Sequence, residues 1–462
     1  MRVEFVTQGD RNDGFPAANP ARLINFFPEP MPEGSAARFQ LRAVPGTQPW
    51  AFVGGAVVRA LAFVGPDPAE EDRTPRLFAA VGGKLLQITE LSAVNHTGDI
   101  EEDAETWIDS NNGDVTVTAG GKFFVWDGSA MDEPGPGPFD GFGGHVHLGG
   151  YTVLTQRGGR RFCWSGLQNA GTLPGLNFAT AEARDDFLIR PMAAMGNLWL
   201  MKERSIEVWA LSGEAGANAF TRIPGAVIDR GLLAYGLVAS TPDGLVFVGD
   251  DGVVYITIGT TTQRISSPAV NAAVKAERPS HCFYYEHEGH RFFVLRFRDR
   301  PAWVCDLSHG GLWHERASGD GGAWRVTAAA KAFGRWLGAG IGGSVWRFCD
   351  QCEDAGEPLI RSVVSRDATM ESQRFRVHAI EAQARVGLLV NGGRDGRLQM
   401  RVSRDGGITW GAWKERSLGF QGEFWQRVVF WSLGQARRFA IELRASDNAD
   451  IRLLSAVDAR LG

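Results

Sequence analysis

The sequence is poor in the residues that mark common catalytic and binding classes. Its 462 residues include five cysteines, an odd number that does not suggest a disulfide framework. The formal net charge is −5, and no basic block is interleaved with aromatic residues. A protein that reads DNA or RNA normally carries a basic face, so tight phosphate binding is not expected.

Long hydrophobic runs are also missing. The longest, residues 50–65, is interrupted by Arg59 and several glycines and is too short to cross a bilayer. The first residues reach acidic side chains without an apolar core, so no signal peptide is expected. We therefore expect a soluble protein that is made in a reducing cytoplasm, without membrane insertion.

No catalytic motif stands out in the chain. Walker A and G-x-S-x-G patterns are absent, and a glycine-rich loop at residues 338–343 leads into another apparent strand rather than the helix that a dinucleotide site needs. The pair Cys349 and Cys352 has no second ligand pair, which a zinc site usually requires. The pairs His145–His147 and His287–His290 could bind a metal weakly, but His145 and His147 share one strand face and are expected simply to form hydrogen bonds there. We predict no catalytic, cofactor-binding or metal-binding residue, no cofactor and no enzymatic activity.

Glycine and tryptophan are abundant instead. The 59 glycines imply many tight turns, and the 15 tryptophans need buried or stacking sites of the kind that layered sheets offer. A turn–strand–turn–strand unit recurs, and the glycines of its last four copies, at 196, 244, 289 and 334, lie 45 to 48 residues apart. Periods of about 40–50 residues with four short strands are typical of β-propeller blades. The alternative is a large irregular β-sandwich.

We therefore predict an all-β fold. It comprises an extended N-terminal anchor (1–49), a β-propeller of six or seven blades (50–356) and a C-terminal β-sandwich (357–462). Residues 219–275 illustrate one unit, with a hairpin around 249–252. A short helix follows, capped by Ser267 and with Pro268 at its first position.

Two stretches outside the repeats carry specific patterns. Near the N-terminus, a Pro-bounded run offers apolar anchors that we expect to pack against the propeller: Leu23, Ile24, Phe26 and Phe27. In the C-terminal segment, an S-x-D-x-G-x-T-W turn known as an Asp box is formed by Ser403, Asp405, Gly407, Thr409 and Trp410. In such a turn the aspartate can accept backbone N–H bonds while the tryptophan packs beneath the hairpin.

Collinear phrases give the chain a family resemblance. NPARLINFFPE, LNFATAEARDD, EVWALSG, FTRIPGA, DGLVFVGDDG and RISSPAVNAAV occur in this order between Asn19 and Lys275. The series resembles the packaged-DNA stabilisation, or tail-nozzle, proteins of short-tailed bacteriophages. The residues Val58, Arg59 and Ala60 resemble the family's opening V-R-G phrase, but Ala60 stands where that phrase usually has glycine.

The resemblance implies a structural virion protein of a tail hub, assembled in the host cytoplasm. Copies would form a ring, expected to be a hexamer, below the portal and adaptor. This ring would retain packaged DNA and conduct it during ejection without sequence-specific binding. Implied partners are the adaptor, or head-to-tail connector, a tail fibre or tailspike, and a plug or needle protein.

An alternative from another class is a sialidase-like or glycan-binding propeller adhesin, because Asp boxes also occur in sialidases. A sialidase would usually repeat the box in each blade and add an arginine cluster, whereas this chain has one box outside the repeats. For a DNA conduit, we predict an acidic or neutral inner wall, with Glu70, Glu71 and Asp72 as possible lumen-facing residues.

Overall fold

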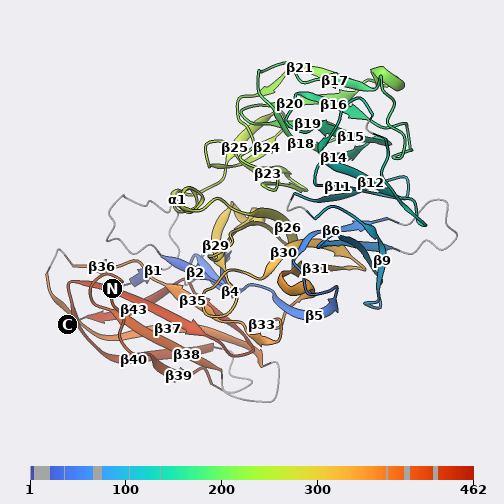
Figure 1. Ribbon diagram of the computed structural model, residues 1–462. Helices are drawn as coiled ribbons and strands as arrows, with labels where there is room; N and C mark the ends of the chain where they lie inside the picture. Colours follow the sequence, from blue (N-terminus) through green and yellow to red (C-terminus); the bar gives the residue numbers. More distant parts are fainter. Residues whose placement is uncertain are drawn as a thin grey trace.

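The computed structural model describes residues 2–4, 21–35, 37–65, 75–102, 105–135, 137–370, 373–389, 396–419 and 425–461. Nearly all of its regular structure is β-sheet (Figure 1). The helical elements are α1 (Pro268–Ala276) and the short 3-10 helices η1 (Gly216–Asn218), η2 (Leu307–His309) and η3 (Ile341–Gly343). In the described part of the chain, no helix is long and apolar enough to cross a membrane.

Six propeller blades are built from four consecutive strands each. Their strands are β6 (Val58–Val64), β7 (Arg76–Val81), β8 (Lys84–Ile88) and β9 (Val94–Asp99); β10 (Trp107–Asn111), β11 (Asp114–Ala119), β12 (Lys122–Trp126) and β13 (Met131–Asp132); β14 (Phe142–Leu148), β15 (Tyr151–Gln156), β16 (Arg161–Trp164) and β17 (Phe178–Thr180); β18 (Leu188–Ala194), β19 (Asn197–Lys202), β20 (Ile206–Leu211) and β21 (Phe220–Ile228); β22 (Val238–Thr241), β23 (Gly244–Val248), β24 (Val254–Ile258) and β25 (Thr261–Arg264); β26 (His281–His287), β27 (His290–Arg296), β28 (Ala302–Asp306) and β29 (Leu312–Arg316).

A seventh blade closes the ring with a strand from the N-terminal part of the chain. Its first three strands are β30 (Val326–Ala332), β31 (Arg335–Gly340) and β32 (Ser344–Cys349), and the fourth is β5 (Gly46–Phe52). Antiparallel pairing of β32 with β5 joins the two ends of the propeller. The first strand of every blade contacts the first strand of the next, from β6 round to β30 and back to β6. The predicted propeller is therefore confirmed.

The predicted repeat glycines occupy equivalent places in four blades. Gly196, Gly289 and Gly334 lie in the turn between the first and second strand, and Gly244 begins the second strand directly after that turn. Three of the turns have positive φ at both central residues: Met195–Gly196, Glu288–Gly289 and Phe333–Gly334. This conformation defines the type I′ hairpin turn, whose twist matches that of the strands. In the fifth blade, Ser267 caps α1 as predicted, its hydroxyl accepting the N–H of Val270.

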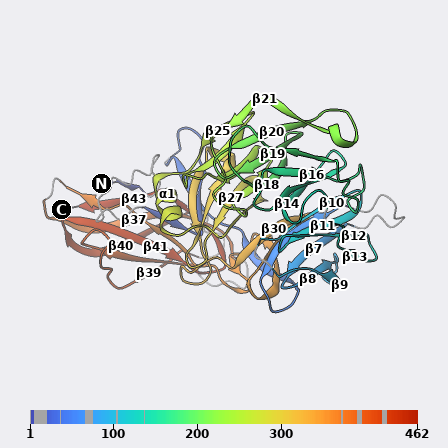
Figure 2. The same cartoon turned by 45° about the horizontal axis from the view of Figure 1, so that its top comes forward.

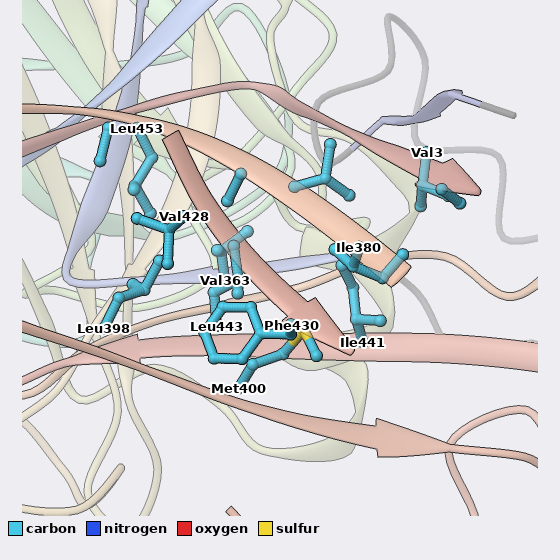
Figure 3. Packing of buried hydrophobic residues seen from close by; sticks show 14 of the residues in the cluster. Val3, Val363, Ile380, Leu398, Met400, Val428, Phe430, Ile441, Leu443 and Leu453 are labelled. Atoms are coloured by element: carbon cyan, nitrogen blue, oxygen red, sulfur yellow. The ribbon is translucent and has the colours of Figure 1, made fainter. Parts of the chain in front are cut away.

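The C-terminal sandwich consists of two facing sheets. One contains β1 (Arg2–Glu4), β3 (Phe26–Pro30), β4 (Phe39–Ala43), β37 (Phe375–Leu389), β40 (Trp425–Ala436), β42 (Ala449–Leu454) and β43 (Ala456–Leu461). The other contains β2 (Arg22–Ile24), β35 (Arg361–Val364), β36 (Ala368–Thr369), β38 (Arg397–Ser403), β39 (Lys414–Ser417) and β41 (Arg438–Ala445). Between them lies one apolar core that includes Ile380, Met400 and Phe430 (Figure 3).

Sandwich and propeller share continuous sheets. Strand β2 pairs in parallel with β29 of the sixth blade, at Ile24 and Glu315, and antiparallel with β35 of the sandwich. The small strands β33 (Glu353–Asp354) and β34 (Glu357–Pro358) extend the seventh blade beyond β5. The two termini lie close together at the sandwich end of the molecule, on the side away from the propeller (Figure 2).

The four anchor residues have different surroundings. Leu23 and Phe26 are buried in the sandwich core, whereas Phe27 packs under the sixth and seventh blades beside Phe292. Ile24 is half-buried at the junction of β29 and β35. These apolar residues were expected to pack against the propeller. Leu23 and Phe26 lie in the sandwich instead, because their strands, β2 and β3, belong to the two sandwich sheets.

Candidate functional site at the propeller axis

Large side chains fill the propeller axis. Arg190 of β18 extends between Trp107 of β10 and Tyr235, its guanidinium carbon lying 3.6 Å from the Trp107 ring centroid and 4.9 Å from that of Tyr235. On the far side, Gly144 of β14 lies so close to Tyr235 that a Cβ there would be 2.8 Å from Cε2 of the ring. Inner strands of three blades and the segment before β22 thus meet at this cluster.

Arg190 is a fully buried cation with few polar partners. Its Nη1 donates to the backbone oxygen of Tyr235 at 3.2 Å, whereas Nε and Nη2 have no hydrogen-bond partner among the described residues. Burial lowers the pKa of the Arg190 guanidinium. Attraction to groups that include Asp109 raises this pKa, but by less. Nearby, burial lowers the pKa of His281 to about 4 and the positive charge of Arg190 acts in the same direction, so His281 is neutral at pH 7.

Two cavities, each of about 290 Å³, flank this cluster. The first is lined by inner strands of five blades and includes Trp107, His281 and Trp336. The second includes Tyr235 and Arg157 and lies against inner strands of the third and fourth blades. Cavities of this size can hold a small molecule, but the Arg190 cluster between them leaves no passage for a nucleic acid duplex through the propeller itself.

Substitution of Arg190 tests how the axis is sealed. We expect Arg190→Ala to lower the free energy of unfolding by about 2 kcal/mol, because truncating this fully buried side chain leaves a cavity among the rings it packs against. Arg190→Met should retain most of the stability, since it fills the space and removes a buried charge that lacks a close anionic partner. Urea unfolding of both variants measures the difference, and equal losses would contradict a mainly space-filling role.

The Asp box forms the predicted turn in the sandwich. The Asp405 carboxylate accepts the N–H groups of Ile408 (3.0 Å) and Thr409 (2.9 Å) and the Thr409 hydroxyl (2.5 Å), while the Ser403 hydroxyl accepts the N–H of Gly407 (2.7 Å). Trp410 is half-buried with the guanidinium of Arg401 over its ring. The turn follows β38 in the sandwich and takes no part in the axial cluster.

Asp405→Ala should lower Tm by a few degrees, because the turn loses its internal acceptor. Hydrogen bonds from Thr409 and Ser403 hold the pKa of Asp405 well below its usual range. A depressed carboxyl pKa stabilises the fold above the unfolded pKa, and this contribution is lost as pH falls through the folded pKa. The difference in Tm between the parent and Asp405→Ala should therefore become smaller in strong acid. Asp458→Ala, at an exposed position of the same sandwich, is the matched control, and equal Tm values for both variants would contradict the prediction.

The remaining candidate residues from the sequence lie away from the propeller axis or outside the described residues. Glu70, Glu71 and Asp72 fall outside the described residues. Cys349 and Cys352 are free thiols near the end of the seventh blade, where Cys352 contacts the backbone oxygen of Ala449.

Sequence reasoning missed Arg190. It stands in the apolar run Leu188–Ala194 and directly precedes Pro191, and a charged residue in a buried strand is the signal that could have found it.

The chain matches the family model described as Bacteriophage P22 Gp10, beta-propeller, over residues 11–340. Curated protein sequences gave no match.

Similar solved structures include the computationally designed Ika8 protein, at 12% identity and a TM-score of 0.42, covering 66% of this chain and 100% of that one. Virginiamycin B lyase from Staphylococcus aureus has 13% identity and a TM-score of 0.43 over 66% of this chain and 98% of the lyase. BamB from Moraxella catarrhalis has 12% identity and a TM-score of 0.40 over 76% and 98% of the two chains.

Proposed function

Because this chain belongs to the phage stabilisation family of Bacteriophage P22 Gp10, we propose that it is a structural virion protein of a phage tail hub or nozzle. Copies of the chain form a ring below the portal and adaptor, retain the packaged DNA and conduct it during ejection. The observation that carries the proposal is the family match, which extends over residues 11–340 and so covers most of the propeller.

Because the propeller axis is closed, a DNA conduit formed by a ring of several copies is favoured over a conduit through a single chain. Arg190, Trp107 and Tyr235 fill the axis, so DNA has no path through one subunit. A conduit must then lie between subunits that surround a common axis. Closed rings are built from identical heterologous contacts, and we propose six copies for this one.

The proposed role is structural rather than catalytic, and the site of action is the virion tail after assembly in the host cytoplasm. Proposed neighbours are the adaptor, a tail fibre or tailspike, and a plug or needle protein. Exposed apolar side chains on the blades offer surface for such contacts, among them Phe52, Leu91, Met195 and Ile258.

Particle mass and shape test the ring. The purified full chain, alone and mixed with the adaptor of the same phage, is measured by native mass spectrometry and imaged by electron microscopy. Closed rings, alone or on the adaptor, would support the proposal. A chain that stays monomeric in both samples and binds or cleaves glycans would favour the propeller-adhesin alternative.

We also predict that the inner wall of the ring is acidic or neutral, because each Lys or Arg contact with phosphate adds a counterion-release contribution to binding. The net charge of −5 is consistent with this. Filter binding of duplex DNA by the isolated ring should show little retention even at low salt. Strong retention that falls steeply as salt rises would contradict the prediction.

A further inference from the structure

Two histidines and an aspartate converge at one end of the sixth blade. His290 begins β27, Asp306 ends β28, and His309 closes the short helix η2 that follows. Their candidate ligand atoms all lie within 4.8 Å of one another. Sequence spacing hides this cluster, because His290 and Asp306 are brought together only by pairing of β27 with β28.

The distances are close to those of a metal site. Oδ2 of Asp306 lies 2.8 Å from Nδ1 of His290 and 3.5 Å from Nδ1 of His309. Zinc bonds to nitrogen and oxygen of about 2.0–2.1 Å in a tetrahedron place neighbouring ligand atoms roughly 3.3 Å apart. The His309 ring is exposed, so it can rotate to close the remaining gap, and it leaves an open approach from solvent.

The surroundings fix the ligands as a metal site requires. Oδ1 of Asp306 accepts the N–H of Ser308 at 3.0 Å, whereas Oδ2 shares a hydrogen bond of 2.8 Å with Nδ1 of His290, and a cation bound between these two atoms would replace that proton. Nε2 of His290 faces Oε1 of Glu29 at 3.5 Å, and Glu29 is held in turn by Arg42 at 2.9 Å. Metal-binding histidines commonly direct their second nitrogen at a carboxylate, which fixes the tautomer and orients the ring.

We propose that His290, Asp306 and His309 form a binding site for a divalent transition metal of the zinc class. Two imidazole nitrogens and one carboxylate oxygen are ligands that suit Zn²⁺, Co²⁺ or Ni²⁺, with a water completing the coordination. Through Glu29 on β3, the metal would also tie the N-terminal strands to the sixth blade.

A second cluster on the same turn is the main competitor. His287, Glu288 and Asp350 also group their ligand atoms, and Nε2 of His287 lies 2.9 Å from Oδ1 of Asp350. Glu288 is already paired with Arg42, and both acidic residues of this cluster are exposed. His287→Ala therefore serves as a neighbouring control that the proposal predicts to be silent.

Cobalt titration of the tag-free, EDTA-treated full chain tests the site. We expect one equivalent of Co²⁺ to bind with visible absorption bands, to be displaced by Zn²⁺, and to raise Tm. His309→Ala, at an exposed position where the variant should fold, is expected to abolish this binding, and Glu29→Gln to weaken it by about 10–100-fold. His287→Ala should bind as the parent does.

Three outcomes would overturn the proposal. They are no stoichiometric cobalt binding by the parent chain, parent-like binding by His309→Ala, or a loss of binding in His287→Ala. Circular dichroism of each variant shows whether it is folded. Should His309→Ala prove unfolded, Asp306→Asn takes its place with the same expected loss.

Discussion

Phe26→Ala is expected to lower the free energy of unfolding of the sandwich by about 3–5 kcal/mol, the usual cost of truncating a buried phenylalanine. Phe26 is fully buried in the core that also contains Leu41 and Phe430. Its strand β3 pairs only with β4 in the described sheet, so the side chain supplies much of what holds that edge. Urea unfolding followed by tryptophan fluorescence measures the change.

The matched control is Phe52→Ala, because Phe52 is 64% exposed and its loss should change stability by no more than about 0.5 kcal/mol. Deleting the first thirty residues removes β1, β2 and β3 together and should lower Tm further than Phe26→Ala does. An unchanged Tm after that deletion would mean that the N-terminal strands are dispensable for the fold.

Lys202→Met is expected to destabilise the fourth blade by about 3–5 kcal/mol, because it leaves buried carboxylates without their cation. The Lys202 ammonium is fully buried, 2.8 Å from Asp186 and 3.1 Å from Glu207, and it donates to the backbone oxygen of Arg184 at 2.6 Å. Burial opposes ionisation of Asp186, but bonds from Lys202 and the backbone N–H of Arg204 keep its pKa below the usual range.

The pH dependence of Lys202→Met has a definite sign. Because the pKa of Asp186 is lower in the folded state than in the unfolded state, its ionisation stabilises the fold above the unfolded pKa, and this contribution is lost as pH falls through the folded pKa. Acid should therefore reduce the difference in free energy of unfolding between the parent and Lys202→Met. Adding Glu207→Gln to Lys202→Met should recover part of the loss, because one buried charge is removed. Lys122→Met breaks an exposed pair with Glu101 and should leave Tm nearly unchanged. A similar loss in both lysine variants would contradict the argument from burial.

Local chemistry made the fold class readable from the sequence. The glycines at 196, 244, 289 and 334 predicted blades because each marks the same turn, and positive φ there depends on the residue itself rather than on distant neighbours. The cap of α1 by Ser267 and the bonds of Asp405 to Thr409 were predicted for the same reason, since donor and acceptor lie within a few residues.

Long-range pairing decided the rest. Strand β5 completes the seventh blade by pairing with β32, and Phe26 lies in the sandwich core. Neither placement has a local signal, because the strands that pair with β5 and pack on Phe26 come some 300 residues or more later in the chain. The axial cluster of Trp107, Arg190 and Tyr235 depends on closure of the whole ring. The sequence by itself determined turns, strands and family, and only the tertiary structure decided which side chains meet, since contacts between blades have no fixed spacing along the chain.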